Sequence, residues 1–192
     1  MSELKSKIKR EFLESAEVKR LFVEESADLI AQTTERIIAA LKQGRKIVLF
    51  GNGGSATDAS HLASELVNRY TKIRKALPAI ALTTDPSVIT SIGNDSDFSE
   101  IFARQIEALG RKGDIAIAIS TSGKSPNVLK AVEAARAIGM ATIGFTGGDG
   151  GPLAKRVEHA FIVPSKVTAR IQETHITLGH VICGLVEEAF GQ

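Results

Sequence analysis

Five short apolar runs, separated by segments of helical pattern, constrain the fold of this 192-residue chain more than any other feature. Each run is nearly continuous rather than alternating, which indicates strands buried on both faces of a parallel sheet. The runs are KIVLF (46–50), AIALT (79–83), DIAIAIS (114–120), ATIGFT (141–146) and HAFIVP (159–164). The segments predicted as helical crossovers and as the last helix are about 54–69, 86–110, 126–138, 151–156 and 168–190. The pattern predicts a doubly wound α/β fold with a five-stranded parallel sheet.

A long helical segment precedes the first strand. Apolar residues from about Glu3 to Ala40 recur at helical spacing, and neither Gly nor Pro interrupts them before Gly44. Two interpretations stay open. The segment packs against the sheet of its own chain, or it forms a pair of amphipathic helices that bury their apolar stripes against a second subunit.

Composition excludes several classes of protein. The net charge is only +2 without a block of basic residues, Trp is absent and Tyr70 is the single Tyr, which argues against a nucleic-acid partner. Cys183, the single cysteine, lies among apolar residues and is predicted to be a core residue of a protein from a reducing compartment. No apolar run is long enough to cross a bilayer, so we expect a cytoplasmic protein without a membrane partner.

The predicted strands end in small, polar, Gly-rich segments. These segments are GNGGS (51–55), TTDPS (83–87), STSGKS (120–125) and TGGDGG (146–151). Ligands of open α/β sheets bind beyond the carboxyl ends of the strands. We therefore expect a ligand site lined by backbone N–H groups and hydroxyls at this edge.

The turn from Gly51 to Ala56 fits the pattern G-x-G-x-x-A of dinucleotide-binding proteins. That class needs an acidic residue about 20 residues further on, at the end of the second strand. Here Asp85 follows the second predicted strand roughly 30 residues on. The turn therefore predicts an anion site at a helix N-terminus, with dinucleotide binding and a purely structural turn as alternatives.

The loop from Ser120 to Ser125 holds four hydroxyls in six residues. Ser125 is expected to cap the following helix, with Pro126 at its first position. The remaining hydroxyls exceed what capping requires and favour a phosphate cradle, although a loop that only caps its helix is the alternative. The spacing of a P-loop is missing.

His61 and Glu65 are four residues apart on the helix that follows the first turn. That spacing places both on one face, where they could ligate a metal ion, act as an acid/base pair, or form a solvated pair. Gln172, Glu173, His175 and His180 interrupt an apolar surface on the last helix. Gln172 and His180 are expected roughly on one side, in a site or a surface stripe, whereas His159 is predicted to be structural.

Four segments together resemble the phosphoheptose isomerases of the sugar-isomerase (SIS) domain superfamily. They are GNGGSATDASHLASEL, GND at 93–95, STSGKS, and RIQETH followed by His180. The resemblance implies a single SIS domain over residues 1–192 with a flavodoxin-like sheet. Residues 1–43 would be oligomerisation helices of a homotetramer with shared active sites, and 44–192 the α/β sandwich.

The implied activity converts sedoheptulose 7-phosphate into D-glycero-D-manno-heptose 7-phosphate through an enediol, the first step of bacterial ADP- or GDP-heptose synthesis for lipopolysaccharide or related glycans. The resemblance makes Glu65 and His180 the acid/base pair and implies one zinc ion per subunit. The implied zinc ligands are His61, Glu65, Gln172 and His180.

The resemblance also assigns substrate contacts. The implied phosphate-binding residues are Ser55, Ser120, Thr121, Ser122 and Ser125. The implied sugar-binding residues are Asn52, Gly53, Gly54, Asn94 and Asp95, besides Glu65 and Gln172 from the metal site. One departure is Ala169, where some members of the family carry Asp before the Arg-Ile-Gln-Glu run.

A second functional class shares the same superfamily. Some members are non-catalytic regulators that bind the replication initiator or sense a sugar phosphate. Those regulators lack the acid/base set, so the joint presence of His61, Glu65, Gln172 and His180 favours the enzyme.

Overall fold

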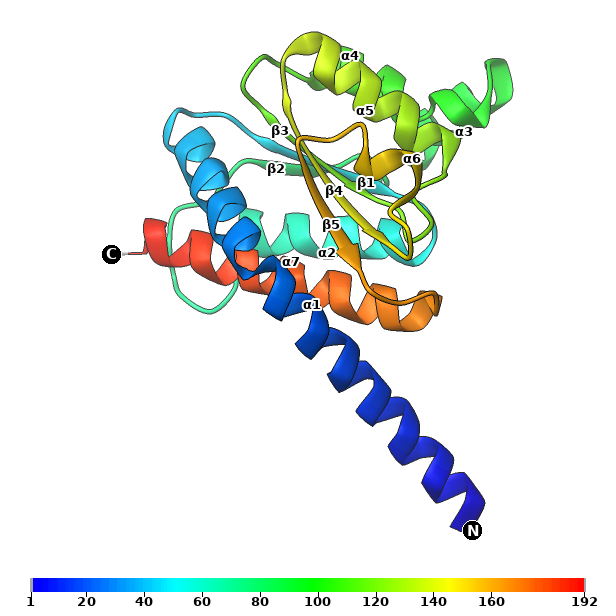
Figure 1. Ribbon diagram of the computed structural model, residues 1–192. Coiled ribbons are helices and arrows are strands. Elements are labelled where there is room, and N and C mark those ends of the chain that lie inside the picture. The colour runs from blue at the N-terminus through cyan, green and yellow to red at the C-terminus, as the bar shows by residue number, and fades with distance from the viewer. Residues whose placement is uncertain (1, 192) are drawn as a thin grey trace.

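The five apolar runs form one parallel sheet in the computed structural model, which describes residues 2–191 (Figure 1). The strands are β1 (Ile47–Gly51), β2 (Ala79–Ala81), β3 (Ile115–Ile119), β4 (Ala141–Gly147) and β5 (His159–Val163). Their spatial order is β2-β1-β3-β4-β5. This is the flavodoxin-like order of a doubly wound fold, so the predicted fold class is confirmed.

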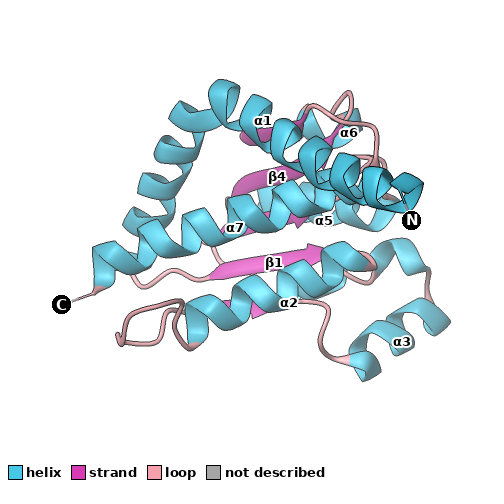
Figure 2. Ribbon diagram, turned by 90° about the horizontal axis from the view of Figure 1, so that it is seen from below, coloured by secondary structure: helices cyan, strands magenta, loops and turns pink. Residues whose placement is uncertain are grey.

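Helices cover both faces of the sheet (Figures 1 and 2). The helices are α1 (Ser2–Lys42), α2 (Gly54–Val67), α3 (Pro86–Asp95), α4 (Ala103–Leu109), α5 (Pro126–Ile138), α6 (Gly151–Ala154) and α7 (Thr168–Phe190), with a 3₁₀ helix, η1, at Phe98–Glu100. The layer with α2 and α7 lies on one face and the layer with α4 and α5 on the other.

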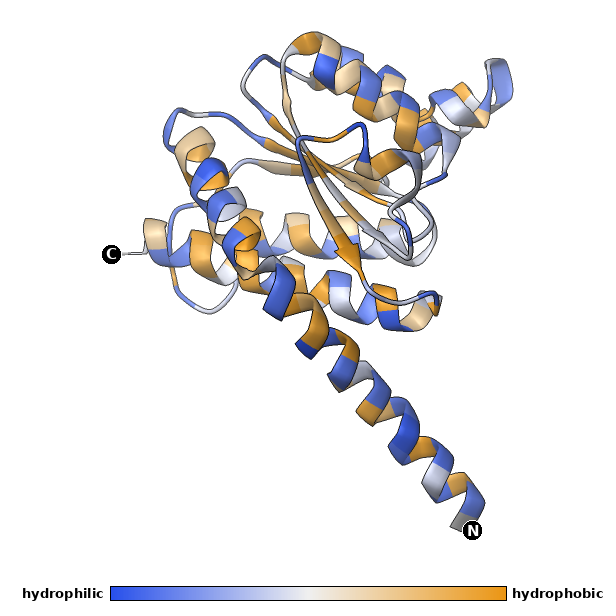
Figure 3. Ribbon diagram, in the orientation of Figure 1, coloured by the Kyte–Doolittle hydropathy of each residue, from blue (hydrophilic) through white to orange (hydrophobic). Residues whose placement is uncertain are grey.

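Strand β1 shows how the sequence builds two cores. Ile47 and Leu49 pack with α1, α2 and α7, whereas Val48 and Phe50 pack with α4 and α5. Every residue of β1 is buried, because successive side chains of a strand point to opposite faces and both faces are covered. Figure 3 shows this apolar sheet between helices that are apolar on their inner sides.

The pair of N-terminal helices, one of the two interpretations left open, is wrong, because α1 is one helix of 41 residues. No Gly or Pro lies between Glu3 and Gly44 to end it. Its C-terminal half packs in the core through Ile30, Ile37 and Leu41. Its N-terminal part projects from the body and exposes apolar side chains such as Ile8 and Phe12 (Figures 1 and 3).

The segment 86–110 is the expected crossover from β2 to β3, but it is divided into three helices rather than one. Helix α3 ends at Asp95, and the Asp97 carboxylate then accepts a hydrogen bond from the backbone N–H of Ser99, which starts η1. Asp and Ser offer the backbone such local alternatives to a continuous helix. Helix α4 resumes only at Ala103. Nowhere in residues 2–191 is a helix both long and apolar enough to cross a membrane.

The topology brings two of the predicted ligand loops side by side. From β1 the chain crosses to β2 at one edge, and it later returns to β3 on the other side of β1. The loops that follow β1 and β3 therefore flank the switch point of the sheet, where ligands of this fold class bind.

Candidate active site

The turn after β1 requires its glycines for two different reasons. Gly53 has a φ of 55°, in the left-handed region that favours glycine. A Cβ atom on Gly54 would collide with the side-chain amide of Gln172, which therefore lies directly against the start of α2. The turn thus brings a polar side chain of α7 to the N-terminus of α2.

Asn52 and Asn127 join the two loops at the switch point. The Nδ2 group of Asn52 donates to Oδ1 of Asn127 at 2.9 Å, and Nδ2 of Asn127 donates back to Oδ1 of Asn52 at 2.8 Å. This paired amide contact ties the turn after β1 to the first turn of α5. Sequence reasoning missed Asn127, whose only signal is its place directly after Pro126.

The hydroxyl-rich loop after β3 lies beside this contact. The Oγ atoms of Ser120 and Ser125 are 3.1 Å apart, and Ser122 Oγ accepts a hydrogen bond from the backbone N–H of Lys124 at 3.2 Å. Ser125 is the N-cap residue of α5 and Pro126 follows it in the first turn, as predicted, but within residues 2–191 its hydroxyl faces Ser120 instead of bonding to the helix backbone. Thr121 and Ser122 line one wall of a cleft of about 380 Å³.

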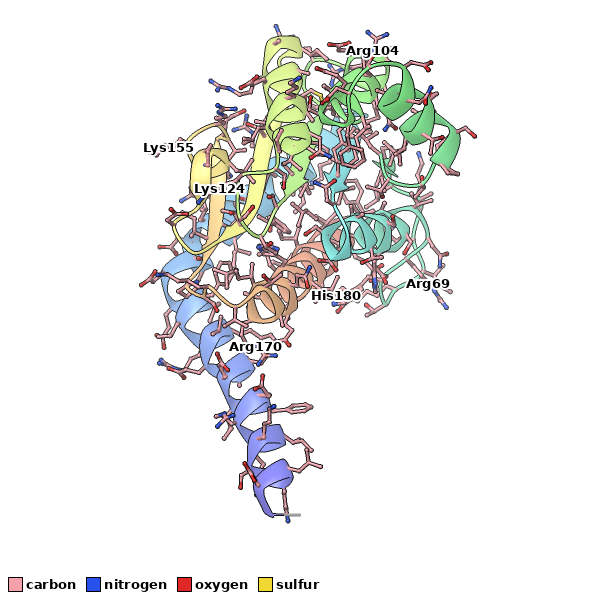
Figure 4. The ribbon with its side chains drawn as sticks, turned by 90° about the vertical axis from the view of Figure 1, so that its right-hand side faces the viewer. Arg69, Arg104, Lys124, Lys155, Arg170 and His180 are labelled. Carbon is pink, nitrogen blue, oxygen red and sulfur yellow. The ribbon has the colours of Figure 1, made fainter. Side chains whose placement is uncertain are left out.

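Three predicted site residues converge between α2 and α7. His61 Nε2 lies 3.1 Å from Glu65 Oε1 and 3.2 Å from His180 Nε2. The ligand atoms of the three residues all lie within 4.8 Å of one another. Glu65 is half-buried with 20% of its side chain exposed, whereas 48% of the His61 side chain is exposed. Figure 4 shows His180 on the same face of the molecule as Lys124 of the hydroxyl-rich loop.

Close packing of α2 on α7 explains why the two histidines meet. Gly179 precedes His180, and a Cβ atom on it would collide with Leu62, the residue that follows His61. Without a side chain at Gly179 the two helices approach closely at this level. The helical spacing of the sequence indicated the pair on α2 but not its contact with α7.

The remaining predicted residues fall into two groups. Ser55 is buried in the first turn of α2, near the switch point. Asn94 and Asp95 are exposed at the end of α3, where Asn94 Nδ2 donates to Asp95 Oδ1 at 2.8 Å. Among the described residues, neither has a hydrogen bond to a predicted site residue outside this pair.

The other candidate residues of the sequence analysis have structural contacts. His175 is buried, its Nε2 lies 3.0 Å from the backbone oxygen of Thr146, and burial lowers its pKa to about 4. Glu173 pairs with the buried Arg170 at 2.6 Å. His159 begins β5 with its Nδ1 2.7 Å from Thr33 Oγ1, and Cys183 is buried as expected. Burial raises the pKa of the Cys183 thiol to about 12, so it is not a reactive thiolate.

A sheet of this order, with hydroxyl-rich loops at its switch point, matches the SIS domain: a model of the SIS domain family matches residues 11–147. A curated phosphoheptose isomerase of Thermodesulfovibrio yellowstonii is 55% identical over 97% of this chain and 92% of its own length. One from Aquifex aeolicus is 57% identical over 95% of each chain. The solved phosphoheptose isomerase from Francisella tularensis has a TM-score of 0.93 at 39% identity, over 98% of this chain and 100% of its own. The chain belongs to the phosphoheptose isomerase family of SIS-domain proteins.

Proposed function

We propose that this protein is an aldose–ketose isomerase that converts sedoheptulose 7-phosphate into D-glycero-D-manno-heptose 7-phosphate in bacterial heptose synthesis. The observation that carries the proposal is the cluster of His61, Glu65 and His180, which lies on α2, the helix that follows the Gly-rich turn, and on α7, whose Gln172 packs against that turn. The family supports it, because relatives with more than half of their residues identical are named phosphoheptose isomerases.

Glu65 and His180 have the chemistry that the reaction needs. Isomerisation moves a proton from C1 to C2 of the sugar through a cis-enediol and moves a second proton between the two oxygens. In this proposal the Glu65 carboxylate takes the proton from C1 and returns it to C2. His180 donates a proton to the oxygen on C2 and recovers one from the oxygen on C1 through the ring nitrogen that does not hold the metal.

The two loops at the switch point are proposed to hold the substrate. The hydroxyls of Ser55, Ser120, Thr121, Ser122 and Ser125 would bind the phosphate, together with backbone N–H groups at the N-termini of α2 and α5. Asn52, Gly53 and Gly54 would contact the sugar. Asn94 and Asp95, which are exposed at the end of α3, would contact the sugar as well.

We also propose one zinc ion per subunit, held by His61, Glu65, Gln172 and His180. The donor set fits: two imidazole nitrogens and a carboxylate oxygen lie within 4.8 Å of one another, and each can present a lone pair to a cation. Gln172, packed against Gly54, would add a neutral oxygen. When bound, zinc would act as a Lewis acid that polarises the sugar carbonyl.

The assembly is proposed to be a homotetramer, with α1 as its main contact. The N-terminal part of α1 exposes Leu4, Ile8, Phe12 and Leu13, and this stripe would be buried against a second copy of the chain. A shared site would also cover the exposed His61. A clean monomer in sedimentation of the intact chain would contradict the assembly. The cytoplasmic location and the role in lipopolysaccharide synthesis stay predictions from the sequence.

Incubation of the purified protein with sedoheptulose 7-phosphate tests the function. We expect the aldose phosphate to form until the two sugars reach equilibrium. A protein that binds the sugar phosphate without turning it over would instead be a sensor or regulator, the alternative that the relatives do not favour. Fructose 6-phosphate serves as a shorter control substrate and tests whether the site needs the seven-carbon chain.

A further inference from the structure

A single buried carboxylate holds the loop that follows α2. Glu187, near the end of α7, is 1% exposed. It accepts hydrogen bonds from the backbone N–H groups of Tyr70, Thr71 and Lys72 at 2.8, 2.6 and 2.8 Å. The Thr71 hydroxyl donates to the same carboxylate at 2.8 Å. Four donors from three consecutive residues therefore fix the course of this loop on α7.

The same carboxylate is linked to the end of α2. Arg74 Nε lies 3.4 Å from Glu187 Oε1, and both side chains are 1% exposed. The Arg74 guanidinium donates to the backbone oxygens of Glu65 at 2.7 Å and Leu66 at 2.8 Å. Helix ends leave such carbonyl groups without partners inside the helix. Arg74 thus fastens the backbone of Glu65, the proposed base.

Tyr70, held by its own N–H on Glu187, lies over the proposed acid. The rings of Tyr70 and His180 stack with centroids 5.5 Å apart and an interplanar angle of 28°. A Cβ atom on Gly184 would lie in ordinary van der Waals contact with Tyr70, 3.4 Å from its Cε1, so the ring packs close to this part of α7. His180, Gly184 and Glu187 share one face of α7, and the loop that follows α2 packs on this face.

The charge on Glu187 is part of this arrangement. Burial raises its pKa, but the hydrogen bonds from Thr71, Tyr70 and Lys72 lower it more strongly, to about 2. The carboxylate is therefore ionised at neutral pH, where it accepts from all four donors and faces the buried Arg74. A neutral amide of the same shape has only one accepting oxygen.

We infer that Glu187 is a positioning residue of the reaction: it orients His180 through Tyr70 and Glu65 through Arg74. The inference rests on the proposed function and adds to it, because none of Glu187, Tyr70 and Arg74 has a role in the site assigned above. Small displacements of reacting groups cost large factors in rate, so a residue that fixes both partners acts on kcat more than on KM.

The test compares Glu187→Gln with Glu188→Gln, a matched change at the next residue, whose side chain is exposed. We expect Glu187→Gln to lower kcat at least about tenfold with KM changed less than about threefold, and Glu188→Gln to change neither. Tyr70→Phe keeps the ring and should retain activity, whereas Tyr70→Leu should lose as much kcat as Glu187→Gln.

A spectroscopic readout separates positioning from general stability. The chain holds no Trp and only one Tyr, so tyrosine fluorescence anisotropy and the near-ultraviolet tyrosine signal report on Tyr70 alone. We expect both to fall in Glu187→Gln while the helical content stays unchanged, and to stay at wild-type values in Glu188→Gln. If Glu187→Gln does not fold, Tyr70→Leu carries the test, because Tyr70 is already 37% exposed in the wild-type protein.

Two results would overturn the inference. One is a folded Glu187→Gln protein with wild-type kcat, and the other is wild-type kcat in Tyr70→Leu. Either result leaves the proposed function intact as long as the wild-type protein turns over sedoheptulose 7-phosphate. If the wild-type protein does not turn over sedoheptulose 7-phosphate, the proposed function itself is contradicted. The failure of the inference and the failure of the proposed function are therefore distinguishable.

Discussion

His61 Nε2 on α2 and His180 Nε2 on α7 lie 3.2 Å apart, although 119 residues separate them in the sequence. Each nitrogen has a single lone pair when unprotonated, and the Glu65 carboxylate lies 3.1 Å from His61 Nε2. Such a convergence of basic atoms is costly without a shared proton or a cation. We therefore expect the cluster to serve the chemistry of the site rather than the stability of the fold.

Gly179 sets the distance between the two helices that carry this cluster. A branched side chain in Gly179→Val would push Leu62 and move α2 from α7. We expect a loss of about 2 kcal/mol in the free energy of unfolding, measured in urea, and a large loss of activity. Combining it with Leu62→Ala should restore part of both, because the smaller residue makes room. A double variant no better than Gly179→Val would argue against this packing.

Ser122 tests the phosphate cradle. Its exposed hydroxyl lies at the cleft and, within residues 2–191, has one hydrogen bond, from the backbone N–H of Lys124. Ser122→Ala should therefore leave the fold intact and raise KM several-fold, which is the effect expected from the loss of one hydrogen bond to a charged group. The effect on kcat should be smaller. Steady-state kinetics separate the two constants. An unchanged KM would place the phosphate elsewhere, and Ser91→Ala on α3 is a control.

Metal removal tests the zinc proposal. Protein purified without added metal should contain close to one zinc per chain by elemental analysis. Chelation should abolish turnover, and added zinc should restore it. The His61→Gln variant should lose the metal as well, whereas His159→Gln should keep it, because His159 contacts Thr33 instead. Full activity in a metal-free sample would make the metal incidental.

His175 predicts a specific dependence of stability on pH. Burial lowers its pKa from the usual 6.5 to about 4. Between these values the unfolded chain binds a proton that the folded chain does not, so the free energy of unfolding falls as pH drops below about 6.5. We expect His175 to account for about 2 kcal/mol of loss between pH 7 and pH 5.

His175→Gln provides the check, because glutamine can still donate a hydrogen bond to the backbone oxygen of Thr146. Urea unfolding of both proteins at pH 7 and pH 5 measures the difference. Between pH 7 and pH 5, the free energy of unfolding of the variant should fall by about 2 kcal/mol less than that of the wild-type protein. Equal losses in the two proteins would mean that His175 titrates normally in the folded state.

Much of the fold could be predicted from the sequence, because parallel strands buried on both faces leave continuous apolar runs. The last helix begins and ends at the predicted residues, Thr168 and Phe190. The break in 86–110 was not foreseen, since Asp97 and its neighbours act through local side-chain contacts that leave no periodic pattern. The single α1 was misread because a continuous amphipathic pattern does not reveal how many helices share it.

The site was predictable in part for a related reason. Residues on one helix, such as His61 and Glu65, reveal themselves by spacing. Contacts between elements do not: Asn127 meets Asn52 across 75 residues, and Glu187 meets Thr71 across 116. Contacts between distant elements leave no compositional bias and no periodic pattern in the sequence. Only the packed structure identifies them.

Turnover of sedoheptulose 7-phosphate by the wild-type protein, Glu65→Gln and His180→Gln decides whether these two residues are the acid/base pair. We expect the wild-type protein to form the aldose phosphate, and each variant to fold normally but to lose at least about a hundredfold in kcat. Glu188→Gln and His159→Gln, matched changes outside the cluster, should keep wild-type kcat. Turnover at the wild-type rate in a folded Glu65→Gln or His180→Gln protein would contradict the assignment of these residues as the acid/base pair.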